Sequence, residues 1–171
     1  MQIHELMTEA PTCCMPDASL RDMAQAMADH DCGALPVIEK TDGHQIIGVV
    51  TDRDIVVRAV AQSTALNHVS ARDIMTRTPV TARASDDVED VREAMATNQL
   101  RRILVVDGDR ACTGIVAQAD LARYLDAAQV AETVQRVSQP AGEGAVSTLP
   151  PDPAEQQPEP EPPQPEPPQQ Q

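Results

Sequence analysis

The chain repeats its own sequence, and this repeat limits the fold more than any other feature. Residues 6–11 (LMTEAP) return as residues 74–79 (IMTRTP), a shift of 68 positions that is kept over a long stretch. Two positions are then lost in a turn, and the matches continue as Gly48 with Gly114 and Asp54 with Asp120. A duplicated sequence of this length predicts two similar structural units that share a core.

Each unit is predicted to be α/β, with its elements in the order β-α-β-β-α. In the first unit, apolar residues recur at helical spacing after Ser19, which forms an N-terminal capping box with Asp22. The elements expected there are a helix from residue 20 that stops near 33, strands at 35–38 and 46–50 around a turn at 41–43, and a helix at 54–61. The second unit gives a helix at 87–98, strands at 103–107 and 113–116 around 108–109, and a helix from 120 whose apolar spacing allows it to continue to 137.

The last part of the chain changes abruptly in composition, to Pro, Glu and Gln. Such a segment has too little apolar area to offset the entropy of ordering it, so we expect a disordered tail biased toward polyproline II. Either this tail only keeps the protein in solution, or it binds a groove lined with aromatic side chains in a partner. The predicted boundaries are repeat one at 1–66, repeat two at 67–127, a helical extension at 128–138 and the tail at 139–171.

The charge of the chain argues against several classes of partner. The formal net charge is −14; residues 138–171 contribute six acidic groups and no basic one, and the only lysine is Lys40. An acidic body of this kind does not attract a nucleic acid backbone or an anionic membrane. The first residues lack the pattern of a signal peptide and no apolar run is long enough to span a membrane, so we expect a cytoplasmic protein with reduced thiols.

Residues 48–54 read Gly-Val-Val-Thr-Asp-Arg-Asp at the predicted step from a strand into a helix. This phrase, within a duplicated β-α-β-β-α unit, resembles the CBS domain family, named after cystathionine β-synthase, whose marker is Gly-x-x-Thr/Ser-x-x-Asp. Residues 33–37 and 101–105 also match, and the resemblance extends from residue 1 to about 127. The segment TDRDIVVRAV is particularly similar to small stand-alone bacterial CBS-pair proteins of the hypoxic response type.

The resemblance implies a fold, a ligand and a mode of assembly. In the family, two repeats pack about a pseudo-two-fold axis and leave two clefts for adenosine ligands such as AMP, ADP, ATP or S-adenosylmethionine. Two modules commonly pair, which implies a homodimer. Such a module regulates a partner protein, here unknown, and it is not an enzyme and requires no cofactor. By this resemblance, Thr51 and Asp54 belong to the cleft of repeat one and Asp120 to that of repeat two.

The residues themselves suit such a ligand. The carboxylate of Asp54 can accept hydrogen bonds from both hydroxyls of a ribose, and the hydroxyl of Thr51, at the start of a helix, can donate to a phosphate oxygen. Gly48 would let the ligand approach the strand closely. The alternative is that Thr51 and Asp54 are only a capping box, which satisfies free N–H groups of the helix without any ligand.

Repeat two departs from the family pattern, because Ala117 stands where the family has Thr or Ser. It does carry Arg101 and Arg102 before a strand, at a place where repeat one has no basic residue. We therefore expect one working cleft, with Thr51 and Asp54 of repeat one on the ribose and Arg102, either alone or with Arg101, reaching toward the phosphates. The alternative leaves both arginines as solvated surface groups.

The cysteines and histidines give no support to an enzyme or to a metal site. Under the repeat alignment Cys32 and Cys112 fall on apolar positions, whereas Cys13 and Cys14 are expected to be more exposed. A redox-sensing thiol stays open, although a negative body opposes the lowered pKa that it needs. The histidines are scattered, without the clustering of a metal site or a catalytic triad: His4, His30, His44 and His68.

Two functions remain after these exclusions. The first is a sensor whose occupancy by an adenine nucleotide changes its packing against another protein, and the second is an interaction protein with empty clefts. In either case the apolar helix face of Leu20, Met23 and Met27, with its counterpart in repeat two, is more apolar than one small module can bury. We therefore expect this face to form a homodimer.

Removal of residues 140–171 should leave the melting temperature of the protein unchanged, because Pro140 ends the last helix and the tail lacks apolar periodicity. Calorimetry of the full and shortened chains measures this. A clearly lower melting temperature for the shortened chain would show that the tail packs on the body.

Overall fold

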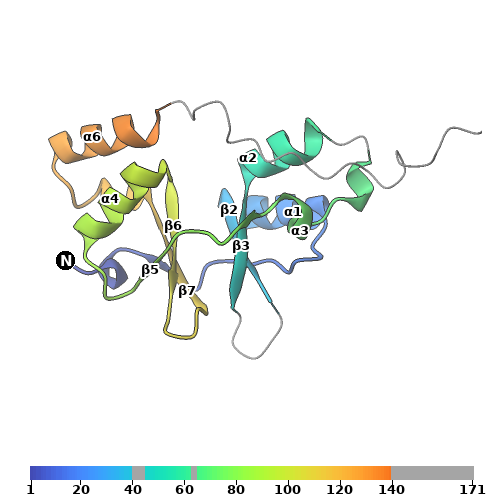
Figure 1. The fold of residues 1–171 in the computed structure, drawn as a ribbon, viewed down its shortest axis with the longest axis horizontal. Helices are drawn as coiled ribbons and strands as arrows, with labels where there is room; N and C mark the ends of the chain where they lie inside the picture. The colour runs from blue at the N-terminus through green and yellow to red at the C-terminus, as the bar shows by residue number, and fades with distance from the viewer. Residues whose placement is uncertain (40–44, 63–64, 140–171) are drawn as a thin grey trace, which may run out of the picture.

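A computed structural model of the chain describes residues 1–39, 45–62 and 65–139. It contains two α/β halves side by side, each built on a small sheet with helices packed against it (Figure 1). The predicted fold of two repeated units is therefore confirmed. The expected turn at 41–43, together with Lys40, His44 and the tail beyond Gln139, lies outside the described residues.

The strands form two sheets. The sheet of the first half has the order β2 (Ala34–Ile38), β3 (Ile46–Thr51) and β4 (Thr76–Arg77). The sheet of the second half has the order β1 (Thr8–Glu9), β7 (Cys112–Ala117), β6 (Arg102–Val106) and β5 (Thr81–Arg83). The α-helices are α1 (Leu20–Asp29), α2 (Asp52–Asp54), α3 (Ala71–Ile74), α4 (Val88–Asn98), α5 (Gln118–Leu121) and α6 (Ala127–Val137). A π-helix (Ile55–Val60) continues α2, and 3-10 turns lie at Ile3–Glu5 and Leu66–His68.

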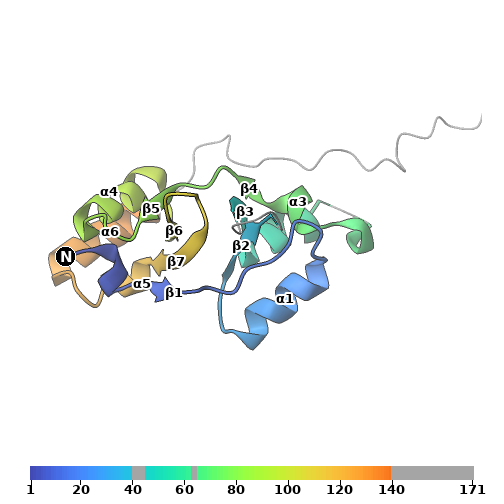
Figure 2. The same ribbon diagram turned by 90° about the horizontal axis from the view of Figure 1, so that it is seen from below.

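The two halves exchange strands. β1 precedes the first repeat's helix α1, yet it pairs antiparallel with β7 of the second repeat, with Thr8 opposite Ile115. β4 is its counterpart and pairs antiparallel with β3 of the first repeat, with Thr76 opposite Val49. Each chain segment then crosses to the other sheet: Cys14 bridges to β2, and β5 pairs in parallel with β6. Figure 2 shows the first of these crossings, from β1 to α1.

The exchange gives the molecule a pseudo-two-fold relation. Gln45 and Ala111 occupy equivalent positions of the repeat, and they form an isolated β-bridge with each other. Equivalent residues can pair in this way only near the axis that relates the two repeats. The two sheets are therefore joined directly, backbone to backbone, as well as through the crossing segments.

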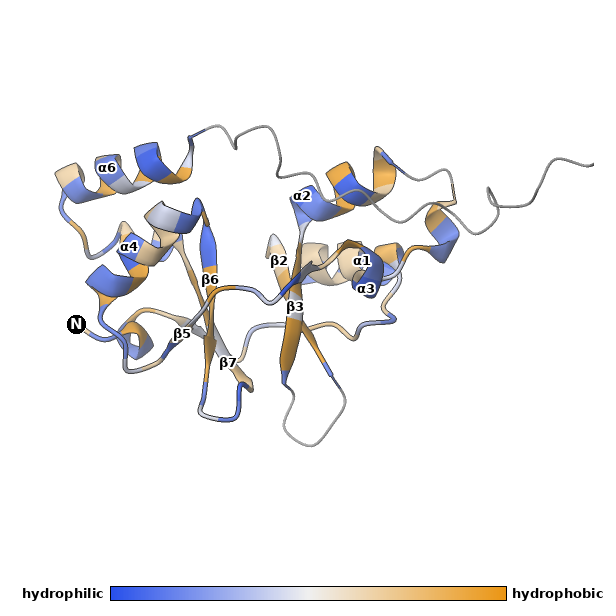
Figure 3. Cartoon of the chain, viewed as in Figure 1, coloured by the Kyte–Doolittle hydropathy of each residue, from blue (hydrophilic) through white to orange (hydrophobic). Residues whose placement is uncertain are grey.

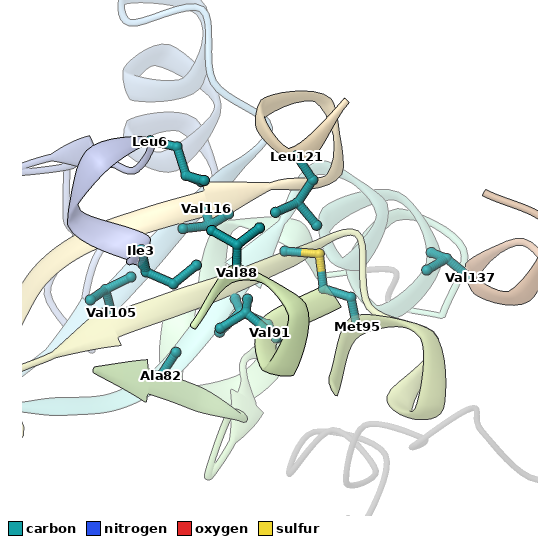
Figure 4. Close-up of a cluster of buried hydrophobic side chains, with 11 residues drawn as sticks. Ile3, Leu6, Ala82, Val88, Val91, Met95, Val105, Val116, Leu121 and Val137 are labelled. Carbon is teal, nitrogen blue, oxygen red and sulfur yellow. The ribbon is translucent and has the colours of Figure 1, made fainter. Parts of the chain in front are cut away.

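Three apolar clusters make up the core, and Figure 3 shows the apolar residues concentrated on the central strands. One cluster fills the second half, between its sheet and α4, and Figure 4 shows its side chains meeting around Val88 and Met95. A second fills the first half. The third joins the halves and contains the buried residues Ile38, Ile46, Leu104 and Val106.

The helix face that the sequence offered for a dimer is not free. Met23 and Met27 are only 0% and 8% exposed, because they pack into the core of the first half, and Leu20 lies partly buried against the same cluster. The counterparts in repeat two, Val88 and Met95, are buried as well. The prediction that this face forms a homodimer is therefore wrong in its residues; α1 uses its stripe to cover its own sheet.

The repeated methionines explain why both repeats have a glycine at equivalent positions of a strand, Gly48 in β3 and Gly114 in β7. A Cβ built on Gly48 would lie 2.6 Å from Sδ of Met75, and one built on Gly114 would lie 2.5 Å from Sδ of Met7. Both methionines precede an exchanged strand, so each packs across the central strand of the sheet that this strand joins. Glycine is required at both positions because the methionine occupies the space of a side chain.

The second repeat ends differently from the helix that the apolar spacing allowed. α5 stops at Leu121, and α6 starts only at Ala127, because Asp126 caps it by accepting a hydrogen bond from the N–H of Gln129 at 2.8 Å. α6 then turns back and packs on α4 (Figure 1). Arg136 donates to both carboxylate oxygens of Glu93, at 2.7 and 2.6 Å, and lowers the pKa of that carboxyl to about 2.

Gly48→Ala should lower the free energy of unfolding by about 1–3 kcal/mol, because the new methyl group overlaps Met75 and overpacked cores lose stability on this scale. Denaturation with urea measures the change. Gly108→Ala is the matched control, since nothing lies within 4 Å of a Cβ at that position. Equal losses in the two variants would mean that the methionine contact does not explain the glycine.

Candidate functional site

The expected ligand residues, apart from one, gather at a single edge of the two sheets. β3 and β7 end at this edge and lead into α2 and α5, while β2 and β6 begin there, opposite the β6–β7 turn (Figure 1). Thr51 and Asp54 lie at the step from β3 into α2, and Asp120 lies in α5. Arg101 and Arg102 lie at the start of β6. Gly48 is the exception, within β3.

Thr51 and Asp54 form a complete capping box. Oδ2 of Asp54 accepts from the N–H of Thr51 at 2.9 Å and from its hydroxyl at 2.7 Å, and the hydroxyl accepts from the N–H of Asp54 at 3.2 Å. Oδ1 of Asp54 lies 3.3 Å from Nε of Arg58, and both side chains are largely buried, 13% and 19% exposed. The predicted capping box is thus formed, and both oxygens of Asp54 have partners inside the chain.

Asp120 is the counterpart of Asp54, but its surroundings are simpler. Its Oδ2 accepts from the N–H of Ala117 at 2.8 Å, and Ala117 has no hydroxyl to add a second bond. Within the part of the chain that the structure describes, no hydrogen bond to Oδ1 is found. The loss of the Thr hydroxyl in repeat two therefore leaves Asp120 with more free acceptor capacity than Asp54.

Arg102 crosses from repeat two to repeat one. A Cβ built on Gly33 would lie 3.0 Å from Nη2 of Arg102 and 3.0 Å from Oδ2 of Asp52, so the two charged groups share the space above this glycine. Both side chains are otherwise exposed. Gly33 makes the crossing possible, because a side chain at this position would displace the guanidinium. The expectation that Arg102 reaches the repeat-one edge thus has a structural basis, whereas Arg101 is an exposed residue beside it.

Asp52 was not among the expected site residues. Its N–H donates to the carbonyl of Gly33 at 3.3 Å, and the equivalent bond in repeat two joins Gln118 to Arg101 at 2.9 Å. This bond ties the start of α2 to the start of β2. In the sequence, Asp52 was marked only by its place in the phrase at 48–54, between Thr51 and Asp54.

The remaining expectations concern approach, metals and membranes. The close approach that Gly48 permits is used by Met75, which fills the space where the ligand was expected.

Among residues 1–39, 45–62 and 65–139, no group of three or more His, Cys, Asp or Glu side chains is placed to hold a metal ion. No helix of these described ranges is long and apolar enough to cross a membrane.

Comparison with known proteins agrees with this geometry. The family model of the CBS domain matches residues 3–60 and again residues 71–127. The chain belongs to the CBS domain family. Its two matched segments are the two repeats that exchange β1 and β4, and the marker phrase lies in the first of them.

Two bacterial relatives share most of this CBS pair. The uncharacterized protein YlbB of Bacillus subtilis is 38% identical over 120 residues, which is 70% of this chain and 79% of that protein. Hypoxic response protein 1 of Mycobacterium tuberculosis is 30% identical over 136 residues, 80% of this chain and 93% of that protein.

Solved structures show the same fold. A crystal structure of hypoxic response protein I, which contains two coordinated zinc ions, matches with a TM-score of 0.65 and 30% identity, over 74% of this chain and all of that one. The CBS domain pair of protein MJ0100, in complex with 5-methylthioadenosine and S-adenosyl-L-methionine, matches with a TM-score of 0.65 and 26% identity, over 72% of this chain and 98% of that one.

Proposed function

We propose that this CBS pair is a non-catalytic regulatory module that binds an adenosine-containing ligand, such as AMP, ADP, ATP or S-adenosylmethionine, between its repeats and passes the occupancy to a partner protein. The observation that carries the proposal is the position of Arg102, whose guanidinium leaves repeat two and lies above Gly33 beside Asp52. A cation from one repeat thereby meets the helix start of the other. The ligands of the MJ0100 pair support the adenosine class.

Arg102 is the anion-binding group of the proposed site. A guanidinium can bind a phosphate or a carboxylate through two parallel hydrogen bonds, so it suits a nucleotide and also the amino acid end of S-adenosylmethionine. The carboxylate of Asp52 borders the same space above Gly33, but none of the ion pairs found among the described residues joins it to Arg102. The guanidinium of Arg102 is therefore available to an anionic ligand, which would also meet the negative charge of Asp52 at this edge.

Asp54 is the proposed ribose residue, because it shares the edge of repeat one with Thr51 and Arg102. Its Oδ2 is held by the capping box, so the ribose hydroxyls would bind at Oδ1, where Arg58 lies at 3.3 Å. Exchange of this contact for a ribose hydroxyl costs part of the binding free energy, since a buried ion pair is weakened. We therefore expect modest affinity.

AMP or ATP at millimolar concentration should raise the melting temperature of the full chain. A ligand at a hundred times its dissociation constant adds about 2.7 kcal/mol to the free energy of unfolding. Arg102→Ala should weaken the effect of nucleotides more than that of adenosine, because Arg102 meets the phosphate and not the ribose. Arg83→Ala is the matched control: it removes the same charge from an exposed residue of β5.

The same melts distinguish the two repeats. Asp54→Ala should abolish the shift caused by the ligand, whereas Asp120→Ala should change it much less, because only repeat one joins a hydroxyl, a carboxylate and the arginine. The reverse order would place the ligand in repeat two, beside the freer carboxylate. Absence of any shift with adenine compounds or S-adenosylmethionine would contradict the sensor.

The second candidate is an interaction protein that works without a ligand. It is favoured by one observation, namely that both oxygens of Asp54 already have partners within the chain. Under this reading Thr51 and Asp54 only begin the helix, and Arg102 and Asp52 only complement each other. Either function would operate in the cytoplasm, which we keep as part of the proposal.

A homodimer is also part of the proposal, with a face different from the one that the sequence suggested. Val56 and Val60 lie one turn apart on the π-helix and are 59% and 55% exposed, so they form an apolar surface on repeat one. We expect sedimentation velocity at micromolar concentration to show a dimer, and Val60→Glu to give a monomer. Val134→Glu, at a residue 43% exposed on α6, is the control and should remain dimeric.

A further inference from the structure

Two cysteines that are far apart in the sequence, Cys13 and Cys112, lie together between the repeats. Cys13 follows β1, on the segment that crosses from the second sheet to the first, and Cys112 begins β7. Both side chains are partly buried and pack on the apolar cluster that joins the two halves. The expectation that Cys13 is a more exposed thiol is therefore wrong: the crossing segment carries it into the interface.

The strand exchange explains why they meet. Glu9 lies opposite Gly114, and the N–H of Ala10 donates to the carbonyl of Thr113 at 3.1 Å, so the crossing segment runs past the start of β7. The N–H of Cys14 then donates to the carbonyl of Pro36 at 2.9 Å, on the first sheet. Successive side chains of an extended segment point to opposite faces, which is why Cys14 packs into the core of repeat one and Cys13 does not.

The contact between the thiols gives them different roles. The interaction between the two neighbouring thiols lowers the pKa of Cys13 and raises that of Cys112, whose S–H donates to the carbonyl of Gly114 at 3.8 Å. While protonated, Cys13 donates to the carbonyl of Pro11 at 3.2 Å. Burial raises the pKa of neighbouring Cys14 to about 11. Cys13 is thus the better nucleophile of the three despite the negative charge of the body.

We propose that Cys13 and Cys112 form an intramolecular disulfide when the protein meets hydrogen peroxide, and that this bond ties the two repeats together. The thiolate of Cys13 attacks one peroxide oxygen, the O–O bond breaks, and hydroxide leaves and takes a proton to become water. The sulfur of Cys112 then attacks the resulting sulfenic acid of Cys13, the S–O bond breaks, and the hydroxyl group leaves as water with the proton of Cys112. Two thiols and one peroxide give one disulfide and two waters.

The bond would hold the crossing segment on β7 independently of any ligand. It closes a loop over residues 13–112, which holds most of both repeats, so it restricts the unfolded chain strongly. We expect the melting temperature to rise on the order of 10 °C on oxidation and to return when dithiothreitol is added.

Peptide mapping of the full chain tests the proposal. After exposure to hydrogen peroxide and alkylation of the remaining thiols, a peptide pair joined through Cys13 and Cys112 should appear in the monomer, with Cys14 and Cys32 alkylated. Cys112→Ser should abolish the pair and leave Cys13 as a sulfenic acid, which a dimedone probe detects. Cys14→Ser is the matched control and should form the bond normally.

The mapping on the wild-type chain does not depend on how any variant folds. A bond between Cys13 and Cys14, a bond only between two molecules, or oxidation of Cys13 without joining Cys112 would each overturn the proposal. Loss of the bond between Cys13 and Cys112 in the Cys14→Ser variant would also overturn the proposal. The reduced melting temperature of each variant shows whether its fold is intact.

Discussion

The exchange of β1 and β4 between the repeats is the contact on which the rest of the molecule depends. Each strand is short, yet each completes the sheet of the other repeat and is followed by a crossing back to its own. The hydrogen bonds of the exchange are made only when both repeats are folded, so neither half can complete its sheet alone. The methionine before each exchanged strand adds packing against a central glycine, which fixes the depth of the contact.

The candidate site follows from this arrangement. Because the exchange sets the two sheets in a fixed relation, the start of β6 comes beside the start of β2, and Arg102 lies above Gly33. A sequence difference between the two repeats then decides which one receives the arginine. Where repeat two has Arg101, repeat one has Gly33, and only the glycine leaves room for an arginine from the other side. The site is asymmetric because the two copies of one segment diverged.

Local patterns predicted the local structure. The helix that begins at Leu20 is capped by Ser19 as the sequence indicated, and the capping box of Thr51 and Asp54 is formed. The strands around 35–38 and 46–50 are present with small shifts in their ends. Such features depend on neighbours within a few residues, so a sequence states them directly.

Long-range pairing was not predictable in the same way. The sequence showed the repeated Met7 and Met75 but not which glycine each covers, and it placed Met23 and Met27 on an outer face because a helical stripe does not say what covers it. The contact of Cys13 with Cys112 depends on the crossing of a whole segment between sheets. Gly48 was misjudged for the same reason, since its close neighbour comes from the other repeat.

The ends of the two repeats show how a duplicated fold acquires one open side. The position of exposed Val60 in repeat one is taken in repeat two by Asp126, which caps α6 and turns the chain back over α4. There Arg92 is 7% exposed and donates to Thr133 of α6 at 3.2 Å, while its counterpart Ala24 in α1 is exposed. Repeat two is therefore closed by its own helix. Within the described part of the chain, Val56 and Val60 of repeat one stay exposed, so a partner that approaches from that side gains apolar contact.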